Sequence, residues 1–173
     1  RELDVTSYVE LTLADPASEQ AHPAFSRMFV QTEFLPEYGA LIAWRRRRSP
    51  EEPEIWVAQF TVVEGTTVAP LQYDSDRNSA FGRDHDQTQP HVITDPAPLA
   101  GTTGTVLDPV FALRDRLLIA PGRTARILVW MVAADSREAL MDLIDRHHDR
   151  SAYDRARTLA WTQAQVQLRH LGI

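Results

Sequence analysis

The sequence contains no cysteine, which excludes disulfide bonds and thiol chemistry. It has no apolar run near the ~20 residues that cross a bilayer and nothing like a signal peptide, so it predicts a soluble chain. An excess of basic residues is also missing, because the formal charge is -6 and the pI is near 5.5. Since nucleic-acid phosphates are bound by concentrated lysine and arginine, we expect no nucleic-acid partner.

The composition is that of a globular chain. With 173 residues, 43% of them hydrophobic, it is long enough for one domain with a full core. It opens on Arg1 rather than methionine, and we therefore expect a piece of a longer polypeptide. The one dense basic run, Arg45 to Arg48, lies between apolar ALIAW and acidic SPEEPE. We expect it to line the exposed end of a strand, with acidic neighbours.

Alternation of apolar and polar residues with period two dominates the first three quarters of the chain and predicts half-buried strands. The stretch ELDVTSYVELTLA alternates except at Ser7 and Tyr8. A second alternating stretch puts four apolar residues on one face, namely Trp56, Ala58, Phe60 and Val62. Residues 111–132 predict a hairpin with a type II turn at Pro121 and Gly122. Its second strand, residues 127–132, is apolar throughout and is typical of a central strand.

The period then becomes helical. Asp135, followed three residues later by Glu138, predicts a capping box at the start of one helix. Ser151 and Asp154 repeat that spacing at the start of a second helix, which Gly172 would end. The apolar stripe of the second helix consists of Tyr153, Ala156, Ala160, Ala164, Leu168 and Leu171.

The polar face of the second helix has few charges. It carries Thr162, Gln163, Gln165 and Gln167, whereas a helix exposed to water normally uses Glu and Lys. Uncharged glutamines beside Trp161 favour a surface that a partner covers.

The stretch QYDSDRNSAFGRDHD packs four aspartates between apolar segments. Asp74, Asp76 and Asn78 match positions 1, 3 and 5 of a calcium-binding EF loop. Ser79 replaces the glycine of that loop and His85 replaces its bidentate glutamate, so the calcium interpretation fails.

Other carboxylate chemistries are also weakly supported. An Asp-x-Asp pair can hold a divalent ion under a diphosphate, but this chain lacks the alternating βαβ organisation that normally presents it. Glycoside hydrolysis needs two carboxylates at a defined separation, which a loop supplies only by accident of folding. We therefore favour a structural stretch in which Asp76 pairs with an arginine or accepts backbone amides. Arg77 should be partly buried, and Gly82 should permit a tight bend.

Signals for cofactors and metals are absent. The loop AGTTGT has no following Lys-Ser or Lys-Thr to hold a nucleotide phosphate. His147 and His148 are adjacent on a helix and cannot share a metal. We expect no cofactor and no metal. Among the tryptophans, Trp44 stays open as a platform for a sugar ring because it lies beside the arginines.

Four motifs in order carry a resemblance that composition could not supply: HPAFSRMFVQTEF, YDSDRNSAFGR, GTVLDPVFALRDRLLIAPG and LAWTQAQVQLRHLGI. Together they resemble the β-sandwich region ahead of the phosphorylase-like part of bacterial cyclic β-1,2-glucan synthases. More distantly, the pattern is similar to the N-terminal domain of cellobiose and chitobiose phosphorylases, once glycosyltransferase family 36 and now glycoside hydrolase family 94. The Asp-Arg and Phe-Gly-Arg that recur there are matched here by Asp76, Arg77, Phe81, Gly82 and Arg83.

The resemblance implies a mainly β fold, an antiparallel supersandwich of the galactose-mutarotase type with one or two C-terminal helices. Residues 1–134 would form the sandwich, and residues 135–173 would form a helical linker toward an absent (α/α)6 barrel. Family members often have glutamate and threonine just before the Asp-Arg, where this chain has the shorter Asp74 and then Ser75.

The family's catalytic aspartate and phosphate-binding residues lie on the barrel, so the resemblance implies a non-catalytic module with no catalytic residue of its own. It would belong to a glycosyltransferase on the cytoplasmic face of the bacterial inner membrane, and a homodimer is allowed. We expect weak binding of β-1,2-glucan or a glucose oligosaccharide through Trp44, Tyr73, Arg83 and His85. The alternative is a stand-alone mutarotase-like enzyme that uses His85 or His91 with Asp84 or Asp86 as acid and base.

Overall fold

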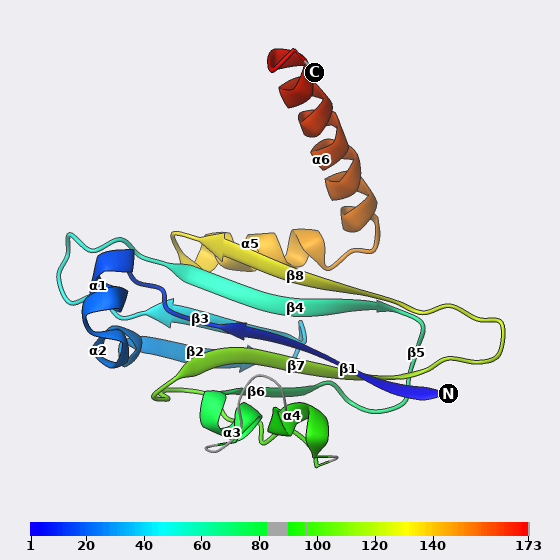
Figure 1. Ribbon diagram of the computed structural model, residues 1–173, viewed down its shortest axis with the longest axis horizontal. Coiled ribbons are helices and arrows are strands. Elements are labelled where there is room, and N and C mark those ends of the chain that lie inside the picture. The colour runs from blue at the N-terminus through cyan, green and yellow to red at the C-terminus, as the bar shows by residue number, and fades with distance from the viewer. Residues whose placement is uncertain (83–89, 96, 173) are drawn as a thin grey trace.

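The computed structural model describes residues 1–82, 90–95 and 97–172. Two antiparallel sheets lie face to face (Figure 1). In the first sheet, β7 (Pro109–Leu118) pairs on one side with β1 (Glu2–Glu10) and on the other with β5 (Thr66–Thr67) and β6 (Gln72–Asp76). The second sheet has the order β2 (Val30–Leu35), β3 (Ala40–Arg45), β4 (Trp56–Glu64) and β8 (Arg126–Ala134).

Helices cover both outer faces of the sandwich. The short helices α3 (Arg77–Phe81) and α4 (His91–Thr94) lie on the first sheet, and α5 (Arg137–His147) lies along β4 and β8 of the second (Figure 1). The helices α1 (Pro16–Ala21) and α2 (Pro23–Arg27) lie between β1 and β2 in the chain. The last helix, α6 (Ser151–His170), projects away from the sandwich (Figure 1). The mainly β fold with C-terminal helices is confirmed.

Strand alternation divides the core into layers. Leu41, Phe111 and Leu113 belong to the cluster between the two sheets. Ile42 and Phe60 face the opposite way and pack under α5. The residues predicted to share one face of β4 all lie on this second side, in or against the cluster under α5: Trp56, Ala58, Phe60 and Val62.

The predicted hairpin of residues 111–132 is wrong. β7 and β8 lie in different sheets, and the segment between them crosses from one sheet to the other. The local turn is as expected, since Arg123 N donates to Ala120 O at 3.0 Å and Gly122 has a φ of 70°. The Pro121–Gly122 turn sets only the local direction of the chain. Which strands β7 and β8 pair with depends on the hydrophobic cluster in which their side chains are buried. β8 is also an edge strand of the described sheet rather than a central one.

Both predicted helix caps are displaced by one residue. Ser136, with an extended backbone, caps α5 and accepts from Ala139 N at 3.2 Å, so Asp135 is not the cap. Arg150 precedes α6 with helical backbone angles and no capping side chain, and Ser151 is already helical. A cap needs extended φ and ψ, which the residue type alone does not specify. Gly172 has a φ of 72° where α6 ends, as expected.

Candidate functional site

The acidic stretch is a self-satisfied structural cluster over its described part. Asp74 is fully buried on β6 and accepts from Asp76 N at 3.0 Å, Ser79 Oγ at 2.6 Å and Ala100 N at 3.2 Å. Asp76 accepts from Asn78 N at 3.0 Å and so caps α3. The prediction that Asp76 accepts backbone amides is confirmed.

Asp74 is the residue that sequence reasoning missed. It was weighed only as a metal ligand, yet its short side chain joins β6 to α3 and to the loop before β7. The neighbouring Ser75 is also fully buried, and its Oγ lies 2.6 Å from Thr32 Oγ1 on the second sheet. The carboxylate of Asp74 and the hydroxyl of Ser75 therefore both have hydrogen-bond partners in this chain.

Arg77 ties this cluster to β1. Its Nε donates to Glu10 at 3.1 Å, and its guanidinium lies 5.3 Å from the centre of the Phe81 ring. The hydrogen bond from Arg77 to Glu10 raises the pKa of the guanidinium. Its side chain is 31% exposed, which confirms partial burial. Gly82 has a φ of 81°, so the predicted tight bend is also present.

The predicted sugar-contacting residues do not converge in the described part of the chain. Trp44 lies on the α5 side of the second sheet and stacks on Trp56, with ring centres 5.0 Å apart. Tyr73 lies between the sheets and stacks on Phe34 at 3.7 Å. Arg83 and His85 lie outside the described residues, as do Asp84 and Asp86 of the mutarotase alternative. His91 of that alternative contacts Asp95 through Nε2 at 2.9 Å.

A carboxylate is buried inside the sandwich. Asp115 on β7 is 7% exposed and lies on the inner face of the first sheet. Burial raises the pKa of Asp115, and a hydrogen bond with Thr61 opposes that rise. Ser7 donates to Gln59 at 3.2 Å across the same gap between the sheets. These polar pairs connect the inner faces of the two sheets.

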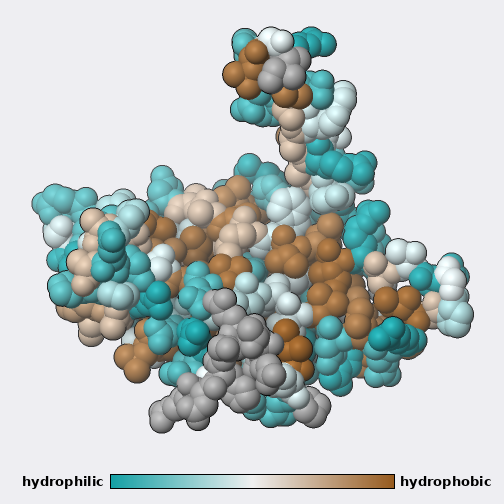
Figure 2. Space-filling view, in the orientation of Figure 1, coloured by the Kyte–Doolittle hydropathy of each residue, from teal (hydrophilic) through white to brown (hydrophobic). Residues whose placement is uncertain are grey.

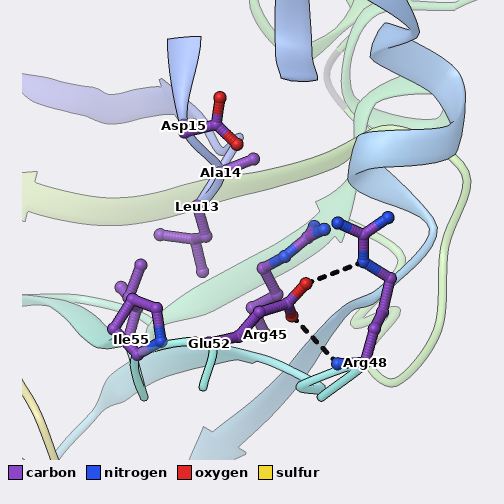
Figure 3. Close-up of a pocket in the computed structure, with 8 residues that line it drawn as sticks. Leu13, Ala14, Asp15, Arg45, Arg48, Glu52 and Ile55 are labelled. Atoms are coloured by element: carbon purple, nitrogen blue, oxygen red, sulfur yellow. Dashed lines mark hydrogen bonds and ion pairs between the residues drawn. The ribbon is translucent and has the colours of Figure 1, made fainter. Parts of the chain in front are cut away.

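The basic run lies where the sequence predicts it, at the end of β3. Arg47 pairs with Glu54 at 2.9 Å, and Arg48 donates to Glu52 through its backbone N and its Nε, each at 2.9 Å. Figure 3 shows the Arg48–Glu52 pair beside Arg45 at the wall of a small hollow. That hollow, of about 110 Å³, is lined by Leu13, Ala14, Asp15, Arg45, Arg48, Glu52, Pro53 and Ile55.

Two classes of feature are absent from the described segments. No group of three or more His, Asp or Glu side chains within them could hold a metal ion. In the same segments, no helix combines the length and the apolar character that a membrane span requires.

Two comparisons with known proteins agree with this architecture. The sequence profile described as "Glycosyl hydrolase 94, supersandwich domain" matches residues 1–150. The chain is 33% identical, over all of its 173 residues, to "Cyclic beta-(1,2)-glucan synthase NdvB" of Rhizobium meliloti (strain 1021). The match covers 100% of this chain but only 6% of that relative, so the chain corresponds to a small part of a much longer protein.

Proposed function

The chain belongs to the family of glycosyl hydrolase 94 supersandwich domains, and from this premise we propose that it is a non-catalytic module of a larger enzyme of the cyclic β-1,2-glucan synthase kind. Its role is to pack against neighbouring parts of that enzyme and to support the sugar site there. The observation that carries the proposal is the uncovered apolar surface of α6.

Helix α6 leaves large apolar side chains in water. Leu159 is 70% exposed, Trp161 is 67% exposed and Leu171 is 73% exposed. Burying a side chain of this kind contributes ~1.5 to 3 kcal/mol, so their combined exposure is costly unless a partner covers them. Between α6 and β8 an open hollow of about 630 Å³, lined by Tyr153, Ala156 and Trp130 among others, adds to this surface.

The edge of β8 is a second uncovered surface. Residues 127–134 carry no charge, and Val129 and Met131 on the inner side are 48% and 45% exposed. Edge strands are normally protected by charges, prolines or bulges. Figure 2 shows apolar side chains gathered on this face, over the region where Figure 1 draws β8, β4 and β1. Further strands of the larger enzyme would bury this face.

The partners in this proposal follow from the resemblance. A helical (α/α)6 barrel is proposed to cover α6, and the complete enzyme is proposed to lie on the cytoplasmic face of the bacterial inner membrane. Among the described candidates, Trp44 is the one proposed to contact β-1,2-glucan weakly, because Tyr73 is packed between the sheets. A homodimer of the chain through α6 is the competing occupant of the same surface.

Light scattering on the isolated chain tests the uncovered surface. We expect the mass to exceed that of the monomer at high concentration, and the double variant Trp161→Glu with Leu171→Glu to restore the monomer. Thr162→Glu is the control, since it adds a charge to the same helix on the side opposite the apolar stripe that contains Leu171. A chain that stays monomeric at every concentration would count against an uncovered docking surface.

Polarimetry tests the non-catalytic role. With freshly dissolved α-glucose, the isolated chain should leave the rate of mutarotation at that of buffer. A rate that rises in proportion to protein concentration would establish the mutarotase-like alternative and overturn the module.

A further inference from the structure

Three guanidinium groups gather around two phenylalanine rings beside α2. Arg45, Arg46 and Arg48 lie 5.2, 6.0 and 5.7 Å from the centre of the Phe29 ring. Arg48 also lies 5.8 Å from the centre of the Phe25 ring. Cation–π contacts of this kind hold a guanidinium by its face and leave its N–H edge available for an acceptor.

Carboxylates balance only part of this charge. Arg48 uses its backbone N and Nε for Glu52, and its two Nη groups bond to no residue that the structure describes. Arg45 donates to the backbone carbonyl of Ser26. Neither Arg45 nor Arg46 forms a salt bridge with an acid in the described segments. Because like charges held close together repel, the cluster favours an added anion, although the whole chain carries -6.

A hollow of about 350 Å³ opens on one side of these arginines. We call it the arginine hollow, and it is lined by Ala17, Ser18, Ala21, His22, Phe25, Ser26, Arg45 and Arg48. No acidic residue lines it, whereas Asp15 and Glu52 line the smaller hollow on the other side of the same two arginines (Figure 3).

Ser26 gives an independent sign of a ligand. The residue is 2% exposed, and its Oγ has no hydrogen-bond partner among the described residues. A buried hydroxyl without a partner is destabilising, and such groups are rare in folded proteins. Ser26 is among the residues that line the arginine hollow, and its backbone carbonyl accepts from Arg45 there.

We propose that the arginine hollow binds the phosphate group of a small ligand. The Nη groups of Arg48 and the guanidinium of Arg45 supply charge-assisted hydrogen bonds, whose planar fork matches phosphate oxygens. Ser26 Oγ donates a further bond. The site is separate from the docking surfaces of α6 and β8 and does not depend on the module role.

Isothermal titration with inorganic phosphate, against chloride at equal ionic strength, tests the site. We expect saturable binding that Arg48→Gln weakens about tenfold or more, which is the usual weight of one charge-assisted bond. Ser26→Ala should weaken it by a smaller factor. Arg47→Gln is the matched control, because Arg47 belongs to the same run but pairs with Glu54 and does not line the hollow.

Glu52→Gln separates binding from folding. If Arg48 binds phosphate, removing its competing carboxylate should tighten binding, whereas a purely structural pair would give no gain. Melting curves of every variant show whether it is folded. Absence of saturable binding in the native chain, equal weakening by Arg47→Gln, or weaker binding in Glu52→Gln would each overturn the site.

Discussion

The two C-terminal helices have similar shares of apolar residues but opposite environments. In α5, Leu140 and Ile144 are four residues apart on one face and are fully buried against the second sheet. In α6, Leu159 and Trp161 are two residues apart and point to different sides, and both stay exposed. A helix with apolar residues on one face can bury them all against one neighbouring surface. A helix with apolar residues on two faces cannot bury both of them against this sandwich.

The largest expected difference between the helices is in the free energy of unfolding. Leu140→Ala should lower it by ~2 to 5 kcal/mol, because it removes a fully buried side chain and leaves a cavity. Leu159→Ala in α6 should change it by less than ~0.5 kcal/mol, because that side chain is 70% exposed. Urea denaturation followed by circular dichroism measures both. Equal losses would mean that α6 is packed in solution.

The next largest effect is expected at the N-terminal cap of α5. Ser136→Ala should lower the free energy of unfolding by ~1 kcal/mol, since it leaves Ala139 N without its capping acceptor. Ser136→Asp is the matched control, because aspartate caps equally well and should keep the native melting temperature. If both substitutions lower it equally, the loss comes from packing at this position rather than from the cap.

Alternation in the sequence predicts which residues share a face, but not which surface that face meets. It placed Trp56 to Val62 correctly, yet paired two strands that belong to different sheets. The helix caps were missed by one residue because capping depends on backbone angles.

The sequence also does not predict which distant residues come together at the arginine hollow. Phe29 and the basic run are distant in sequence, and only the pairing of β2 with β3, where Arg46 N donates to Phe29 O at 2.9 Å, brings ring and arginines together. Trp44 and Tyr73 were grouped by residue type, and the sheet between them separates them.

The ion pair between Arg137, in the first turn of α5, and Glu33 should contribute less to the free energy of unfolding than the Ser136 cap. Arg137 donates to Glu33 of β2 at 2.8 and 3.1 Å, but both side chains are more than a third exposed. Solvent screening therefore limits the contribution to less than ~1 kcal/mol. At pH 7, Arg137→Ala should therefore lower the free energy of unfolding by less than ~1 kcal/mol.

The pH dependence of that loss identifies its cause. The hydrogen bond from Arg137 lowers the pKa of Glu33 below its ordinary value of 4.5. A lowered pKa in the folded state means that the stabilisation is complete above the unfolded value and is lost as the pH falls through the folded one. The gap between the native chain and Arg137→Ala should therefore narrow as the pH falls below 4.5 and close once the pH is below the folded pKa of Glu33. A gap that is unchanged there would assign the effect to the packing of Arg137 on Trp56.

The smallest effect expected is that of removing most of α6. Among its residues only Ala152 is buried, and Tyr153 packs against the cluster under α5. A chain that ends at Asp154 keeps both contacts and loses, apart from the half-buried Ala156, only exposed side chains. Its free energy of unfolding should therefore stay within ~0.5 kcal/mol of the native value. Chemical denaturation at a concentration low enough to keep the chain monomeric measures this. A chain that ends at Arg150, which also loses Ala152 and Tyr153, is the matched control and should unfold more easily. If the shorter removal already costs more than ~1 kcal/mol, α6 folds back onto the sandwich in solution and the contrast with α5 does not hold.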